Sequence, residues 1–258
     1  MFERLEKSFL TIETGEAYQP VRVAYDLLQP NKLQMIFDQL KCVATKNRND
    51  QSWEIFWRDE TDEIHFESLE SFKKPSNPLR LGTFIIKNDT LYLNLPSFKR
   101  ACLLIPLLHQ LIDSSVIKIN KADFINKVFG LNERLPHGLT EIYDDTELDN
   151  IIRQRIHDYH EVEGRCEHAA TAEEAFKILS EYTQTESHKR LPFAERFLFQ
   201  EIEGSEMDDT YLGFYIFLRS RELVAIRRWF GETGYTLGDA ADETVEQVFG
   251  GMNIDIIE

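Results

Sequence analysis

Three histidines and one cysteine lie close together in the second half of the chain, in the pattern His157-x2-His160-x5-Cys166-x-His168. On a helix, His157 and His160 would lie on one face, where two imidazoles can converge on one ion. A turn at Gly164 would then bring Cys166 and His168 back toward them. Nitrogen and sulfur ligands suit zinc, so a metal-dependent enzyme or a metal-stabilised domain is one hypothesis. Because the spacing matches none of the standard structural-zinc patterns, a solvated polar helix face is the alternative.

Other catalytic signatures are weak. Cys166 could become an activated thiolate only if folding brings a histidine such as His160 or His168 against it, which closeness in sequence does not ensure. The chain contains no G-x-x-x-x-G-K-[ST], G-x-G-x-x-G, G-x-S-x-G or H-E-x-x-H sequence. The nucleotide-binding, hydrolase and metalloprotease classes therefore lack their signatures, and zinc is the one cofactor that the residues suggest.

Arg227-Arg228-Trp229-Phe230 is an island of positive charge and aromatic rings in the acidic half of the chain. Arginine and tryptophan are enriched in the residues that contribute most to protein–protein binding, so these four residues are candidates for an interface. Alternatively, the arginines pair with nearby carboxylates and Trp229 packs inside the protein. The second interpretation is favoured by the usual burial of large aromatic side chains.

The stretch 97–130 predicts a helix that begins after Ser97 and is bent or split at Pro106, a short β-branched segment, and a second helix over 121–129. Helix, strand and helix in this order open a winged-helix module, although no third helix or wing follows. Nucleic-acid binding through 97–130 is therefore another hypothesis. Its phosphate contacts would come from basic residues on the exposed side of this stretch, namely Lys99, Arg100, Lys118, Lys121 and Lys127.

Charge divides the chain into two regions. Residues 1–138 contain 18 acidic and 18 basic residues, which leaves 27 of the 45 acidic and 11 of the 29 basic residues for 139–258. The whole formal net charge of −16 therefore belongs to the second region. This argues against nucleic-acid binding through the second region and indicates a solvated surface, or a docking surface for a protein partner with a basic surface.

Apolar periodicity predicts an α+β fold. An N-terminal antiparallel sheet over about 53–95, flanked by helices that include 30–44, would be followed by a helical core at 97–130 within the neutral region 1–138. The region 139–258 reads as predominantly helical and acidic. Its expected helices open at Thr146 and Thr171 and cover 211–230 and 239–249, although the β-branched and aromatic start of 211–230 could also form a strand. Further short elements are expected near 2–10, 21–25, 64–68 and 252–256.

The compartment follows from two further observations. No run reaches the roughly 18 apolar residues of a membrane helix, and charges interrupt the N-terminal apolar residues, so we expect neither a membrane span nor a signal peptide. Cys42, Cys102 and Cys166 are odd in number and far apart, which indicates a reducing compartment. The leading hypothesis is a non-enzymatic cytoplasmic protein that acts through protein–protein contacts, as a subunit or regulator of a larger assembly.

Overall fold

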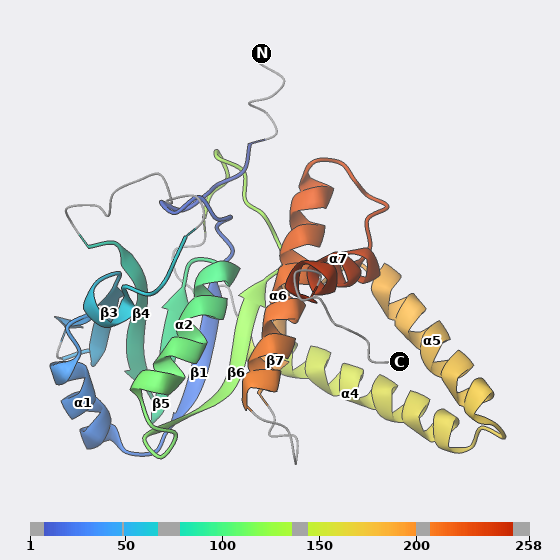
Figure 1. Cartoon of the computed structure of the whole chain (residues 1–258), viewed down its shortest axis with the longest axis horizontal. Helices are drawn as coiled ribbons and strands as arrows, with labels where there is room; N and C mark the ends of the chain where they lie inside the picture. Colours follow the sequence, from blue (N-terminus) through green and yellow to red (C-terminus); the bar gives the residue numbers. More distant parts are fainter. Residues whose placement is uncertain (1–7, 48, 67–77, 136–143, 200–206, 250–258) are drawn as a thin grey trace.

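The computed structural model of the chain describes residues 8–47, 49–66, 78–135, 144–199 and 207–249. Its centre is a seven-stranded antiparallel sheet in the order β2-β3-β4-β5-β1-β6-β7 (Figure 1). The strands are β1 (Val21–Leu27), β2 (Val43–Asn47), β3 (Ser52–Phe56), β4 (Arg80–Lys87), β5 (Thr90–Leu95), β6 (Ile117–Ile125) and β7 (Ala194–Leu198). The predicted α+β class, with a sheet flanked by helices and a mainly helical second region, is confirmed.

The hairpin of β4 and β5 forms as the sequence predicts. Asn88 and Asp89, which join the strands, both have positive φ angles, of 48° and 59°. A two-residue turn of this kind matches the twist of antiparallel strands, and asparagine and aspartate tolerate it. The alternating Leu91, Leu93 and Leu95 are consequently all buried on one face.

Two helices cover that apolar face. Helix α2 (Phe98–Leu111) begins at Ser97, whose hydroxyl accepts a hydrogen bond from the backbone nitrogen of Arg100 at 3.1 Å. Helix α6 (Met207–Trp229) packs beside α2 (Figure 1) and contributes Phe214 and Leu218 to the same core. Both helices are present as predicted, but Pro106 does not split α2, and α6 begins at Met207, four residues before the expected start.

Strand β6 corrects the predicted helix over 121–129 and with it the winged-helix pattern. Its pairing with β1 shifts between Ala24 and Tyr25, so that Asn120 is an extra residue in β6. Before this bulge Ile117 and Ile119 are buried, and after it Ala122 and Phe124 are buried. The bulge thus moves the apolar alternation by one residue. Because of this shift, the buried residues Ile119 and Ala122 are three positions apart in the sequence, a spacing that is typical of a helix.

The first predicted helix also ends early. Helix α1 (Pro30–Gln39) stops five residues before the expected end at 44, and Ala44 lies in β2 opposite Glu54. The carboxylate of Glu60 accepts hydrogen bonds from the backbone nitrogens of Lys41 and Cys42, at 3.1 and 2.8 Å, and so holds the chain as it leaves α1. Within α1, Phe37 still packs its ring on the sheet, with ring centroids 5.1 Å from Trp53.

Three short elements fall partly or wholly outside the described residues. The expected helical turn near 2–10 and the last strand near 252–256 involve residues 1–7 and 250–258, which lie outside them. Ile64 and Phe66 are buried as expected but belong to no strand, and the rest of that predicted strand, 67–68, is outside the described residues.

A row of charges crosses the face of the sheet opposite α2. Arg22 of β1 lies opposite Asp123 of β6, and Asp123 lies opposite Arg196 of β7. The Asp123 carboxylate accepts hydrogen bonds from Arg22 Nη2 and from Arg196 Nε, both at 2.6 Å. All three side chains are buried. The row therefore stabilises the sheet only while every member is present.

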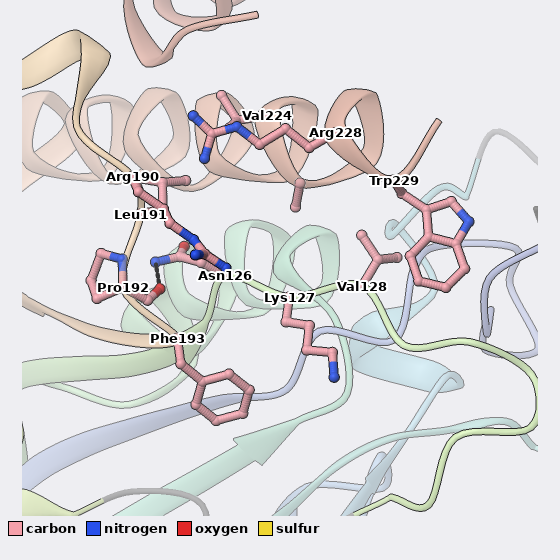
Figure 2. Close-up of a pocket in the computed structure, with 11 residues that line it drawn as sticks. Asn126, Lys127, Val128, Arg190, Leu191, Pro192, Phe193, Val224, Arg228 and Trp229 are labelled. Atoms are coloured by element: carbon pink, nitrogen blue, oxygen red, sulfur yellow. Dashed lines mark hydrogen bonds between the residues drawn. The ribbon is translucent and has the colours of Figure 1, made fainter. Parts of the chain in front are cut away.

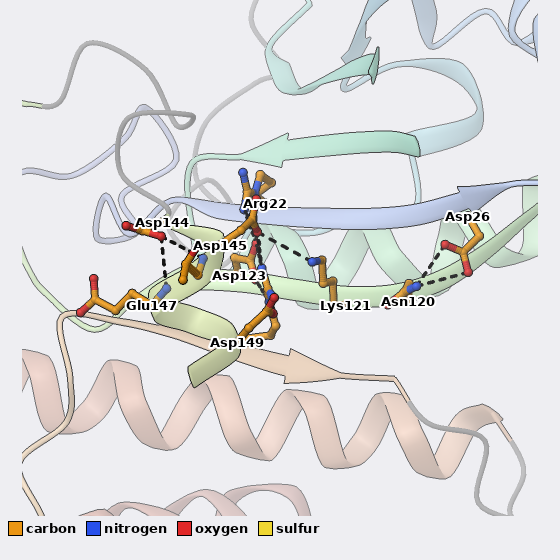
Figure 3. Close-up of polar contacts among 11 residues, drawn as sticks. Arg22, Asp26, Asn120, Lys121, Asp123, Asp144, Asp145, Glu147 and Asp149 are labelled. Atoms are coloured by element: carbon orange, nitrogen blue, oxygen red, sulfur yellow. Dashed lines mark hydrogen bonds and ion pairs between the residues drawn. The ribbon is translucent and has the colours of Figure 1, made fainter. Parts of the chain in front are cut away.

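The second, acidic region joins the sheet through this row. At the start of helix α4 (Asp145–Glu167), Asp145 accepts hydrogen bonds from Arg196 Nη2 at 2.5 Å and from Arg22 Nη2 at 3.0 Å (Figure 3). Asp149, one turn later, pairs with Arg196 as well. Burial would raise the pKa of Asp145, but the hydrogen bond from Arg196 and the charges of Arg22 and Lys121 lower it below its usual value.

On the other face of β7, Glu195 is fully buried. Its carboxylate accepts hydrogen bonds from Arg221 Nε of α6 at 2.7 Å, from the amide of Asn126 at 2.5 Å, and from Arg155 of α4. Burial raises the pKa of Glu195, and the charges of Arg221 and Arg155 overcome that effect and lower it below its usual value. Glu195 therefore connects α4, α6 and β6 through one ionised carboxylate.

We expect Asp123→Ala to lower the free energy of unfolding by about 3–5 kcal/mol, because two buried guanidinium groups would lose their shared partner. Urea unfolding followed by circular dichroism measures the change. Lys177→Ala is the matched control, since it removes the exposed Lys177–Glu181 pair, and exposed pairs contribute less than about 1 kcal/mol. A loss in Asp123→Ala no larger than in the control would show that the row is not a structural requirement.

Glu195 and Asp145 also predict the pH dependence of stability. A carboxyl group whose pKa is lower in the folded state stabilises the protein at neutral pH, and this stabilisation is lost as the pH falls through the folded-state pKa. We expect the free energy of unfolding to fall progressively below about pH 4.5, where unfolded carboxyl groups begin to take up protons. Glu195→Gln should be less stable than the wild type at pH 7 and should lose less stability on acidification. Parallel slopes for the two proteins would contradict this assignment.

Candidate functional site

Helices α4 and α5 form a pair that projects from the body of the protein (Figure 1), here called the arm and comprising residues 145–188. Helix α4 is capped by Asp144, whose carboxylate accepts from the backbone nitrogens of Thr146 and Glu147 at 2.8 and 3.2 Å. This corrects the expected cap at Thr146. Helix α5 (Ala172–His188) begins as predicted, with the hydroxyl of Thr171 accepting from the backbone nitrogen of Glu174.

The arm is attached to the body at the ends of its helices that lie nearest the sheet. The first turns of α4 are held by the charges of β1 and β7, and Leu148 is buried against Ile125 and Phe129. The end of α5 meets helix α7 (Leu237–Phe249), where Gly238 approaches Ser187 so closely that an added Cβ would lie 3.3 Å from its Cβ. The connection between α4 and α5 lies at the opposite end of the arm (Figure 1).

The two helices contact each other along narrow stripes. In α4, Leu148 and Val162 are the buried residues, and α5, described throughout, has none. The thiol of Cys166 donates a weak hydrogen bond to the carbonyl of Ala175 at 3.6 Å, which marks where the helices meet. Ile178, Ala175 and Tyr182 of α5 are half-buried, as expected for the contacting side of this helix.

Several large apolar side chains of the arm are left exposed. Phe176 is 73 % exposed, and Ile156, Tyr159 and Leu179 have exposures between 42 % and 52 %. In each helix this exposed stripe is turned about a quarter of a circle, in the same rotational sense, from the stripe that contacts the other helix. Because the chain reverses direction between α4 and α5, both exposed stripes lie on one side of the arm.

Carboxylates surround these apolar side chains. The arm contains 11 acidic and 4 basic residues. Glu163 follows Tyr159 by one helical turn and Glu173 precedes Phe176 by three residues, and both glutamates are exposed. The arm therefore presents apolar and aromatic groups within a negatively charged rim, a composition that can bind a complementary surface.

The sequence predicted burial for part of this face. The apolar spacing of the sequence places Ile156 and Tyr159 of α4, and Leu179 of α5, on the inward faces of their helices, but the structure leaves these three side chains exposed. Helix α4 carries two apolar stripes, and only the one containing Leu148 and Val162 is buried. The signal available in the sequence was this excess of apolar positions, because a helix that packs on one side needs only one such stripe.

The candidate metal ligands all lie on the arm, and each has its own surroundings. His157 is exposed, and His160 Nδ1 lies 3.1 Å from Glu163. The expected turn at Gly164 is absent, because α4 continues to Glu167 and the Nδ1–H of His168 donates to the carbonyl of Gly164 at 2.6 Å. Across the described ranges, no group of three or more His, Cys, Asp or Glu side chains is placed to hold a metal ion. A zinc site stays a prediction from the sequence.

The residues Arg227–Phe230 lie at the end of α6, and their side chains have different surroundings. Arg227 pairs with Glu232 and with Glu243 of α7, at 3.3 and 3.5 Å, as in the internal interpretation. Trp229 is half-buried and packs against Val128 and Ala225.

The other two members of the island face outward to different degrees. Phe230 is 45 % exposed with its ring edge toward Phe9, and Arg228 lines a cavity treated below. An interface role for these residues stays a prediction.

The basic residues proposed for nucleic-acid contact do not share one exposed side. Arg100 is 2 % exposed, and its guanidinium donates to the carbonyl of Arg80 and the hydroxyl of Thr14, at 2.7 and 3.1 Å. Lys121 belongs to the charged row through Asp145, 3.8 Å away. The expected exposure of Arg100 is therefore wrong, and nucleic-acid binding through 97–130 stays a prediction from the sequence.

Comparisons with models of protein families, with curated proteins and with solved structures find no match for this chain. None of the helices that the structure describes combines the length and the apolar composition needed to cross a membrane.

We expect the exposed face of the arm to contribute little to folding. Phe176→Ala together with Leu179→Ala should change the free energy of unfolding by less than about 0.5 kcal/mol for each residue, because exposed side chains lose few contacts. Leu148→Ala, at the buried base of α4, should cost about 2–5 kcal/mol. Chemical denaturation of the three proteins measures both values. A large loss in the double variant would show that Phe176 and Leu179 serve the stability of the arm.

Proposed function

We propose that this protein is a non-enzymatic cytoplasmic subunit or regulator of a larger assembly, and that the arm binds a protein partner with a basic surface. The observation that carries this proposal is the side of the arm on which Ile156, Tyr159, Phe176 and Leu179 are exposed together. Exposed apolar groups gathered on one surface and rimmed by polar residues are characteristic of interaction sites.

The chemistry of these residues supports a protein partner. Tyr159 and Phe176 are large rigid side chains that gain much contact area when a partner covers them, and aromatic residues are enriched at the centre of interfaces. The surrounding carboxylates would remain at the rim, where charge selects the partner and speeds association. Such a surface needs no catalytic group.

Charge also favours a different protein over a second copy of this chain. The formal net charge is −16, and the arm has nearly three times as many acidic as basic residues. Two arms brought face to face would place like charges together, which opposes association. A partner that presents apolar groups flanked by lysine or arginine would instead neutralise the carboxylates of the arm.

The proposed cytoplasmic location has support of its own. It is supported by three cysteines that form no disulfide. Burial, with hydrogen bonding to Glu60, raises the pKa of Cys42 to about 12, and burial raises the pKa of Cys102 well above its usual value. Both thiols therefore stay protonated and unreactive, as structural cysteines do.

Capture experiments with matched variants test the arm. Three proteins are immobilised and exposed to extract of the native host: wild type, Phe176→Ala/Leu179→Ala and Met35→Ala. Met35 is the control because its side chain, on α1, is 62 % exposed. A partner that is identified by mass spectrometry is then purified and its affinity measured. We expect the arm variant to bind at least about tenfold more weakly and the control to bind as the wild type does.

Two further measurements separate this proposal from others. Glu163→Lys with Glu173→Lys should slow association with that partner and reduce its dependence on salt, because the rim carboxylates would no longer attract a basic surface. Sedimentation of the isolated protein should show a monomer. Equal affinity of all variants, or an oligomer that the arm variant abolishes, would contradict docking of a basic partner on the arm.

A further inference from the structure

A cavity of about 610 Å³ lies where the chain leaving β6 meets the segment before β7 and the last turns of α6 (Figure 2). Its volume falls within the range of small-molecule sites. Three basic side chains line it, each from a different segment: Lys127 after β6, Arg190 before β7 and Arg228 on α6. The cavity is distinct from the exposed side of the arm.

Among the residues that the structure describes, no carboxylate lines the cavity, although acidic residues outnumber basic ones by 45 to 29 in the chain. Lys127 is paired with Glu133 outside the cavity. The guanidinium groups of Arg190 and Arg228 have no ion-pair or hydrogen-bond partner among the described residues. Two positively charged side chains that line one hollow, Arg228 half-buried and Arg190 exposed, create a local field that attracts an anion.

The remaining walls are apolar and aromatic. Val128, Val224 and Ala225 are buried residues that line the cavity, and the rings of Trp229 and Phe193 lie at its sides (Figure 2). Trp229 also packs against Gly130, where an added Cβ would lie 3.2 Å from the ring, so the indole is held in place. These walls would exclude water from the apolar part of a ligand.

Hydrogen bonds fix the relative positions of the walls. The backbone nitrogen of Asn126 donates to the carbonyl of Phe193 at 2.9 Å. The side-chain amide of Asn126 donates to the carbonyl of Pro192 at 3.0 Å and to buried Glu195 at 2.5 Å. The amide nitrogens of Asn126 are engaged and its buried Oδ1, which has no hydrogen-bond partner among the described residues, can only accept, so the positive charges are the donors left to bind an anionic group.

We propose that this cavity is a binding site for a small organic anion, one that joins a carboxylate or phosphate group to a flat apolar body. Arg190 and Arg228 bind the anionic group, since planar guanidinium groups match the geometry of carboxylate and phosphate oxygens. The apolar body packs against Trp229 and Val128. This site is independent of the proposed protein partner and would be occupied whether or not the arm is bound.

Calorimetric titration of the full chain with defined probes tests the site. Benzoate and phenyl phosphate carry the proposed chemistry with two different anionic groups, benzyl alcohol lacks the charge, and inorganic phosphate lacks the apolar body. We expect at least one aromatic anion to bind more tightly than both benzyl alcohol and inorganic phosphate, and to bind less tightly as salt is added. The stronger of the two aromatic anions identifies the anionic group.

Variants assign the binding to this cavity. Arg190→Gln and Arg228→Gln should each weaken the aromatic anion by about tenfold or more, the loss expected when a charged hydrogen bond is removed. Both side chains lie outside the buried core, so the variants should keep the wild-type circular dichroism and thermal unfolding. Phe176→Ala/Leu179→Ala is the control and should bind the anion as the wild type does, which keeps this test separate from that of the arm.

Tryptophan fluorescence supplies a second readout. Trp229 lines the cavity, whereas Trp53 and Trp57 are buried in the core, so binding should change the emission of the wild type and leave that of Trp229→Phe unchanged. The proposal is overturned if no probe binds at millimolar concentration, if benzyl alcohol or inorganic phosphate binds as tightly as the aromatic anions, or if both arginine variants retain wild-type affinity.

Discussion

The carboxylate of Asp123, held between two buried arginines, is the interaction on which the arrangement of this protein depends. Arg22, Asp123 and Arg196 belong to β1, β6 and β7, so one row of charges sets the register of three neighbouring strands. A one-residue shift of either pairing would leave a buried charge without its partner, at a cost of several kcal/mol. Asp145 and Asp149 share the same arginines and thereby place the start of α4.

The geometry of the arm follows from this anchor. Because the charges bind only the first three turns of α4, up to Arg155, the rest of the helix extends beyond the sheet, and α5 returns without burying any of its own residues. The arm is thus folded mainly by attachment at its base and by a narrow contact between its helices. An apolar side can then stay exposed without loss of the fold, which an interaction surface requires.

Elements that depend on neighbouring residues could be predicted from the sequence. The β4–β5 hairpin follows from Asn88-Asp89 and alternating leucines, and the starts of α2 and α5 follow from Ser97 and Thr171. Elements defined by distant partners could not. The second half of strand β6 resembles a helix in the sequence because the bulge disguises the alternation, whereas its first half lies in the predicted short β-branched segment. Strand β7 has no clear signal in the sequence, because Glu195 and Arg196 look like surface residues until their distant partners are known.

The candidate sites likewise depend on partners that are distant in the sequence. Whether an arginine is buried and paired separates the structural arginines from those beside the cavity. Arg22, Arg100, Arg196 and Arg221 are buried, and each binds a carboxylate or a carbonyl oxygen. In a chain so rich in carboxylates, an arginine easily finds a partner. Arg190 and Arg228 lie beside a cavity without a partner among the described residues, and they are 38 positions apart in the sequence, since 228 − 190 = 38. Only the fold brings them together, and a hollow that keeps its positive charges uncompensated in such a protein is best understood as prepared for an anion from outside the chain.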